Sequence, residues 1–198
     1  MAEDGVLTST GAVTNISIPS GKSMAAKATT KATYTGNINA ASPTISSMTQ
    51  VDNTTTPATT TTTSTAGTAY TATAQKPVTV KMSDGTSVTQ TSGTYTVGYS
   101  NPVTTTVTFY DELGKAHHVP LYFTKTATSS TAGNTWTVSV LPDITQSSTT
   151  ITEDDGSTTT VQMTSAQLKF TTEGKLLSGS SSPSLKLTNG AGPWTSTG

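Results

Sequence analysis

The chain has 198 residues, of which only 31% are hydrophobic and 11% are charged, and its formal net charge is -1. Hydroxyl side chains take the place of the missing apolar ones, because 50 residues are Thr and 25 are Ser. The ten cations are all Lys and are balanced by eleven acids, which leaves no basic face for a nucleic-acid partner. The absence of Cys excludes disulfides, thiol nucleophiles and Cys-ligated metals.

Thr favours extended backbone, and 16 Gly and 9 Pro supply turns. No apolar run approaches the ~20 residues of a membrane span and no signal peptide heads the sequence, so we expect no membrane partner. The composition predicts an all-β fold, a small antiparallel β-barrel or sandwich with hairpins and a Thr-rich low-complexity surface loop. The polar start and the abrupt end predict that the sequence is a fragment of a longer protein.

The first half of the chain carries weaker strand signals than the second half. A short strand is predicted around residues 32–38, and a hairpin is predicted where residues 78–82 face Val88 across Asp84 and Gly85. Residues 53–74 are nearly all Thr, Ala and Ser, so they have almost nothing to bury. We interpret this stretch as a mobile surface loop, with an O-glycosylated patch and a Thr-ladder strand as alternatives.

The pattern is clearest over residues 104–140. Residues 104–110 and 117–125 each alternate apolar and polar side chains around a Gly-containing turn at 111–115, which predicts a hairpin. A third strand is predicted at 136–140. The predicted core consists of apolar side chains on one face of these strands, namely Val107, Phe109, Leu121, Phe123, Trp136 and Val138.

Further along, alternating residues flank two more turns. An acidic segment with the favoured turn pair Asp155-Gly156 predicts a hairpin between Ile151 and Val161. Leu168 and Phe170 precede a turn at 173–175, and a closing strand is predicted at 185–187.

No group of residues forms a recognisable catalytic or metal site. His117 and His118 are adjacent and would point to opposite faces of a strand, so we expect an exposed His118, a half-buried His117 and no shared metal. The acidic residues 153–155 lack calcium-loop spacing and are interpreted as a solvated hairpin tip.

Asp111 and Glu112 with Asp143 could supply paired carboxylates for glycoside hydrolysis, but Asp111 can equally cap a turn. We therefore predict no catalytic residue, no metal and no cofactor. Exposed aromatic residues could bind sugars, and the candidates are Tyr95, Tyr99, Tyr110, Tyr122, Trp136 and Trp194. Alternation places Trp136 in the core instead, and Trp194 is expected to cover surface that continues in a longer chain.

Residues 106–117, Thr-Val-Thr-Phe-Tyr-Asp-Glu-Leu-Gly-Lys-Ala-His, resemble a segment of the bacterial flagellar hook protein. The resemblance continues through the alternating residues 119–125 and the Leu-Lys-Phe and Glu-Gly-Lys-Leu elements at 168–176, over about 13–50 and 103–190 in all. The residues that carry this family pattern are Tyr110, Asp111, Gly114, His117, Phe123, Trp136 and Gly174.

The resemblance implies an outer β-domain of the hook subunit. Residues 1–27 would lead into this domain, 28–190 would form it with an insertion at 52–95, and 191–198 would leave it. The family implies an extracellular structural protein, exported by the flagellar secretion system without a cleaved signal peptide. Its partners would be copies of itself in the helical hook and other flagellar axial proteins, bound through parts of the parent chain outside this fragment.

The hook would act as a flexible universal joint that passes motor torque to the filament. A secreted carbohydrate-binding or adhesin β-sandwich remains the alternative, and an accessory domain of a glycan hydrolase is a third possibility.

Overall fold

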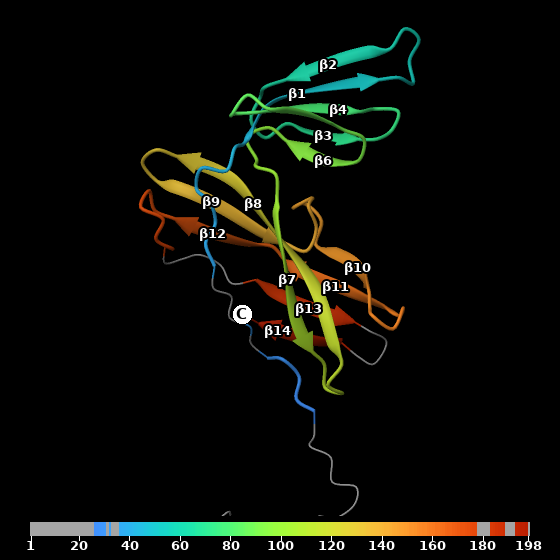
Figure 1. The fold of residues 1–198 in the computed structure, drawn as a ribbon, viewed down its shortest axis with the longest axis vertical. Coiled ribbons are helices and arrows are strands. Elements are labelled where there is room, and N and C mark those ends of the chain that lie inside the picture. The colour runs from blue at the N-terminus through green and yellow to red at the C-terminus, as the bar shows by residue number, and fades with distance from the viewer. Residues whose placement is uncertain (1–25, 31, 33–35, 178–182, 189–192, 198) are drawn as a thin grey trace, which may run out of the picture.

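The structure is a computed structural model that describes residues 26–30, 32, 36–177, 183–188 and 193–197. The regular elements within these ranges are all β-strands, which confirms the all-β prediction. The strands form two units, one above the other in Figure 1, each with its own hydrophobic core. We call residues 44–98 the small unit and the other described residues the large unit.

The large unit contains two antiparallel four-stranded sheets. The first sheet has the order β12-β9-β8-β7, with bounds Ala166–Phe170 for β12, Gly133–Ser139 for β9, Ala116–Ser129 for β8 and Val103–Tyr110 for β7. The second has the order β10-β11-β13-β14, with bounds Ser148–Thr152, Thr158–Thr164, Ser184–Thr188 and Pro193–Thr197. None of the described sheets closes into a barrel, and the arrangement is that of a sandwich.

The core of the large unit lies between these sheets. Phe109, Phe123 and Trp136 come from the first sheet, and Val161 and Leu187 come from the second. Trp136 is only 1% exposed, as its alternation with Val138 predicts. Four of the six predicted core residues are buried, and the other two, Val107 and Leu121, are partly buried against them.

The two hairpins predicted in this unit are present. Strands β7 and β8 pair around the turn at 111–115, and β10 and β11 pair around the turn that contains Gly156. Strand β12 reaches Phe170, which forms an isolated bridge with Leu176 on the far side of the turn at 173–175. Residues 33–35 of the strand predicted at 32–38, most of residues 1–27 and the side chain of Trp194 lie outside the described residues. Residues 32 and 36–38 are described and do not form a strand, so that prediction is wrong at these positions.

The small unit is built from six short strands. A four-stranded sheet has the order β2-β1-β4-β5, with bounds Thr59–Thr63, Ile45–Asp52, Val78–Met82 and Ser87–Gln90. A two-stranded sheet pairs β3 (Ala69–Ala72) with β6 (Gly93–Thr96). Met48, Val78 and Val80 are almost fully buried in its core. The hairpin predicted across Asp84 and Gly85 is therefore confirmed as β4 and β5.

The interpretation of residues 53–74 as a mobile loop is wrong. Residues 53–62 do lie at the surface, but the stretch contains all of β2 and β3, each hydrogen-bonded to a neighbouring strand. Hydroxyls add cross-strand pairs, with 3.0 Å between the Oγ1 atoms of Thr49 and Thr62 and 3.1 Å between those of Thr71 and Thr94. The partner strands supply the buried side chains that the Thr run lacks, and these fix its register.

The two units are joined by a short neck formed by residues 43–45 and 98–100. Ile45 N–H donates to the Tyr99 carbonyl at 2.8 Å, and Gly98 N–H donates to the Ile45 carbonyl at 2.8 Å. Thr44 and Ser100 form an antiparallel bridge directly beside them. The chain thus leaves the large unit and returns to it at neighbouring backbone positions.

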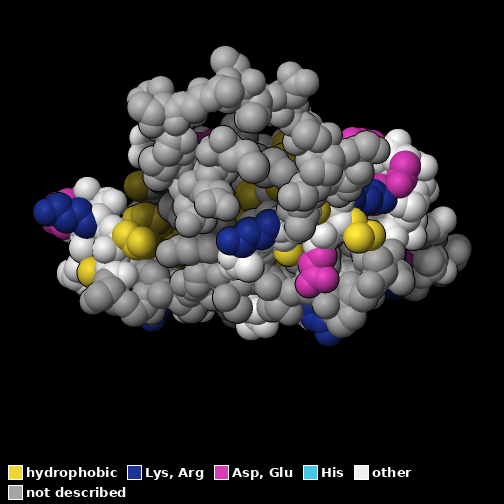
Figure 2. Space-filling view, turned by 90° about the horizontal axis from the view of Figure 1, so that it is seen from below, with side chains coloured by type: hydrophobic (Ala, Val, Ile, Leu, Met, Phe, Trp, Pro, Cys, Tyr) yellow, Lys and Arg dark blue, Asp and Glu magenta, His cyan; other side chains and the backbone are white. Residues whose placement is uncertain are grey.

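On the face seen from below, Figure 2 shows Lys, acidic and hydrophobic side chains at several separate places. The described residues include no helix with the length and hydropathy needed to cross a membrane.

Candidate functional site

The tips of two hairpins in the large unit meet at a buried cluster of charged side chains. His117 of β8 is fully buried, with Asp111 on one side and Glu153 on the other. The His117 Nδ1 atom lies 2.8 Å from Glu153 Oε1, and its Nε2 atom lies 3.4 Å from Asp111 Oδ2. Because an imidazolium carries a proton on each ring nitrogen, it can donate to both carboxylates at once.

Asp111 is held in place by backbone groups as well as by His117. Its Oδ1 atom accepts hydrogen bonds from the N–H groups of Leu113 and Lys115, each at 2.9 Å. Burial alone would raise the pKa of Asp111, but the N–H groups of Lys115 and Leu113 together with His117 lower it below its ordinary value. The predicted turn-capping role of Asp111 is therefore confirmed.

Glu153, at the β10–β11 turn, is the second carboxylate that contacts His117. Burial would raise its pKa, but hydrogen bonds and the positive charges of His117 and Lys115 outweigh this effect and lower the pKa. At the rim of the same contact, Lys115 Nζ donates to Asp155 Oδ2 at 2.8 Å and to Ser157 Oγ at 3.0 Å. The hydrogen bond from Lys115 holds the pKa of Asp155 well below its usual range. The cluster ties one sheet of the sandwich to the other.

Two details of this cluster differ from the sequence prediction. His117 is fully buried rather than half-buried, while the side chain of His118 is 49% exposed as expected. The tip at 153–155 is only partly solvated, because Asp154 is exposed whereas Glu153 is buried. Both corrections have one cause, the meeting of two hairpins that lie 36 residues apart in sequence.

The proposed glycosidase carboxylates do not act together. Asp111 is hydrogen-bonded to His117, and Glu112 is an exposed turn residue. Asp143 accepts hydrogen bonds from the N–H and the hydroxyl of Thr145. No group of three or more His, Asp or Glu side chains among the described residues is arranged to hold a metal ion.

The remaining residues of the family pattern occupy structural positions. The Tyr110 N–H donates to Thr29 Oγ1, and Thr29 N–H donates to the Tyr110 carbonyl, both at 2.9 Å, so the chain before the neck is fastened to β7. Gly114 has φ of 84°, and a Cβ there would lie 3.2 Å from the Ala26 Cβ. Gly174 lies in a turn beside a cavity of about 110 Å³ that Trp136 also lines.

Lys125 is a buried structural residue that the sequence does not point to. It is 4% exposed, and its Nζ donates to the carbonyls of Ala40, at 3.0 Å, and Ser42. The Ser100 N–H donates to the Lys125 carbonyl, and the Lys125 N–H donates to Ser100 Oγ, both at 2.9 Å. Desolvation by burial lowers the pKa of its ammonium group. Lys125 thus fastens to β8 both the chain that leads into the neck, at Ala40 and Ser42, and the chain that leaves it, at Ser100.

The fold and this arrangement are those of a structural β-sandwich domain, in which the buried charges hold two sheets together. Residues 99–197, half of the chain, match the family described as the flagellar basal body protein FlaE D2 domain. The chain therefore belongs to the flagellar hook D2 domain family. Searches of curated proteins and of solved structures found no significant match.

The family membership defines a structural domain of the bacterial flagellar hook. Members of this family build an extracellular polymer that assembles from copies of the subunit together with other flagellar components. The matched residues begin at the neck and run through all eight strands of the large unit. The small unit lies before the matched region.

Proposed function

We propose that the large unit is the outer domain of a hook subunit whose polymer acts as a flexible universal joint and passes motor torque to the filament. The observation that carries this proposal is the family match over 99–197, which coincides with the sandwich. The hydroxyl-rich, nearly neutral surface supports it, because weak polar contacts between neighbouring subunits can be exchanged at small cost as a joint bends.

The partners we propose are copies of the same chain in the helical hook and other axial proteins bound through parts of the parent chain. Export would use the flagellar secretion apparatus without a cleaved signal peptide. The residues of the family pattern have structural roles in this proposal. Tyr110 and Gly114 fix the approach of the chain to β7, and Asp111 and His117 join the two hairpins. The others lie in or beside the core, namely Phe123, Trp136 and Gly174.

We assign the small unit as an insertion in the hook domain and place its bounds at 44–98 instead of 52–95. Two observations support these bounds. The small unit has a core of its own, and the neck closes with Ile45 hydrogen-bonded to Tyr99 and Gly98. In the assembled hook this unit projects outward, away from the parts of the parent chain that pack along the axis.

The experiment is to delete residues 45–98 from the parent hook gene and to compare it with a Trp136→Ala variant of the same gene. The deletion should leave hook assembly and swimming intact, as seen by electron microscopy and by spreading in soft agar. The Trp136→Ala subunit should assemble poorly, because its sandwich loses a core side chain that is 1% exposed. A cell that swims normally with an unfolded large unit would contradict the proposed role.

A further inference from the structure

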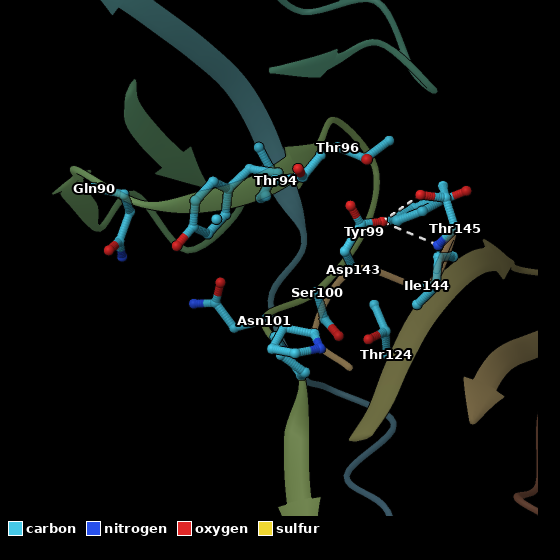
Figure 3. Close-up of a pocket in the computed structure, with 15 residues that line it drawn as sticks. Gln90, Thr94, Thr96, Tyr99, Ser100, Asn101, Thr124, Asp143, Ile144 and Thr145 are labelled. Atoms are coloured by element: carbon cyan, nitrogen blue, oxygen red, sulfur yellow. Dashed lines mark hydrogen bonds between the residues drawn. The ribbon is translucent and has the colours of Figure 1, made fainter. Parts of the chain in front are cut away.

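A cavity of about 270 Å³ lies at the junction of the two units (Figure 3). It is lined from the small unit by Gln90 and Tyr95, from the neck region by Tyr99 and Asn101, and from the large unit by Thr124 and Asp143. Neither the sandwich nor the charge cluster uses these side chains. Two of them, Tyr95 and Tyr99, belong to the aromatic residues for which the sequence suggests sugar binding.

The cavity contains polar groups that the described residues leave without partners. Thr124 is 3% exposed, and no described residue hydrogen-bonds its hydroxyl. The side-chain amides of Gln90 and Asn101 also make no hydrogen bond within the described part of the chain, and Figure 3 shows both pointing toward the same open space, one from above and one from below. The Thr124 Oγ1 atom has almost no accessible surface, so the groups that a ligand could reach are the two amides.

An aromatic ring forms one wall of the cavity in a fixed orientation. The Tyr95 hydroxyl donates to the Ser92 carbonyl at 3.1 Å, which holds the ring. Gly93 makes room for it: its φ is 91°, and a Cβ at this position would lie 3.3 Å from the Tyr95 hydroxyl. A preformed aromatic wall beside two convergent amides is suited to a ligand with one apolar face and several hydroxyls.

The charges of the lining define the ligand further. Among the described lining residues the charged side chain is Asp143, and no Lys lines the cavity. The Asp143 Oδ1 atom already accepts hydrogen bonds from Thr145 N–H and Oγ1, at 3.0 and 2.6 Å, and its Oδ2 atom lies 3.4 Å from Gln146 Nε2. The donors to Asp143 are neutral, so the lining keeps one negative charge and disfavours an anionic ligand.

We propose that this junction cavity binds a neutral sugar, either free or as the end unit of a glycan. The size suits a small ligand, because about 270 Å³ lies near the lower end of the range of ligand pockets, about 300–1,000 Å³. Tyr95 would pack against the apolar face of the ring, and the side-chain amides of Gln90 and Asn101 would form hydrogen bonds with its hydroxyls. This binding role is independent of hook assembly.

The test is a titration of the isotope-labelled 198-residue chain, followed by NMR, with glucose, galactose, mannose and N-acetylglucosamine and with their methyl glycosides. At least one sugar should shift the amide signals of residues 94–101 and 143–145, with Kd on the order of 1–10 mM for so small a ligand. Equal binding of a free sugar and its methyl glycoside indicates a glycan end, and binding of the free sugar alone indicates a free monosaccharide.

Two variants and a matched control sharpen the test. Tyr95→Ala and Asn101→Ala should each weaken binding at least tenfold, and Tyr110→Ala, an exposed Tyr at the far end of β7, should leave it unchanged. Asn101 is exposed and makes no bond to a described residue, so its variant keeps the test valid if Tyr95→Ala unfolds the small unit. The proposal is overturned if no sugar shifts these signals at about 50 mM, or if Tyr110→Ala weakens binding as much as Asn101→Ala does.

Discussion

The large and small units bury different kinds of side chain. The core of the large unit contains Phe109, Phe123 and Trp136 and lies close to a buried charge cluster. In the small unit the fully buried residues are aliphatic, and Tyr70 and Tyr95 pack only at their edge. Cross-strand hydroxyl pairs such as Thr79–Thr89, at 2.8 Å, add to its sheet. One Thr-rich composition therefore supports two kinds of β-structure, one with an aromatic core beside buried charges and one with an aliphatic core and cross-strand hydroxyl pairs.

The largest expected effect is the loss of an aromatic core side chain. Phe123→Ala should reduce the free energy of unfolding of the large unit by about 3–5 kcal/mol, because it removes a buried ring between the two sheets. Calorimetry should show the unfolding transition of the large unit move to lower temperature while that of the small unit stays in place.

The matched control is Met48→Ala, which removes a side chain that is 0% exposed from the core of the small unit. It should lower only the transition of the small unit. If either substitution shifts both transitions equally, the two cores unfold together and the distinction between the units is wrong.

The next largest loss of stability is expected from changes in the buried charge cluster. His117→Leu would leave the Asp111 and Glu153 carboxylates buried without their shared partner, which should cost about 3 kcal/mol or more. Adding Glu153→Gln should restore part of this loss, because only one buried carboxylate then lacks the imidazole. Denaturant unfolding of the single and double variants measures both values, and equal stability of the two variants would show that the carboxylates do not depend on His117.

Acid should weaken the large unit through the same cluster. The pKa values of Asp111 and Glu153 lie below their ordinary values of 3.8 and 4.5, so the unfolded chain takes up protons first as the pH falls. Their stabilising contribution is present above about pH 4.5 and is lost progressively below it. Melting curves between pH 7 and pH 3 should show this loss.

The small unit offers the contrast for the acid experiment. The hydrogen bond from Lys76 lowers the pKa of Asp52 to about 2, but this pair is exposed and salt screens it. Added salt should therefore change the acid response of the small unit more than that of the large unit. The opposite salt dependence would mean that water reaches the His117 cluster.

The smallest expected effect is that of removing the small unit from the chain. Replacing residues 45–98 with a short Gly-Ser linker should shift the melting temperature of the large unit by only a few degrees, because loop closure depends only logarithmically on length, by less than about 2 kcal/mol here. Circular dichroism melting of the shortened chain checks this. A large unit that fails to fold without the small unit would show that the neck contacts are essential to it.

Alternation predicts the strands of the large unit well because Phe109, Val119 and Phe123 each face one core. It fails for Thr59–Thr63, since identical side chains have no apolar face and their pairing depends on β1. His117 is predicted to point away from His118, but the sequence cannot show that Glu153, 36 residues away, covers it. Lys125 is missed for the same reason, because its acceptors at Ala40 and Ser42 lie more than 80 residues earlier.

The neck also has an evolutionary consequence. A unit that departs and returns through one hydrogen-bonded pair, Ile45 with Tyr99, can be gained or lost by a single in-frame event without changing the strand order beyond it. Genes for related hook domains should therefore differ in length at this position more than within the sandwich. The same position would accept a foreign domain whose two ends lie side by side. A domain inserted there would be displayed on the outside of the hook.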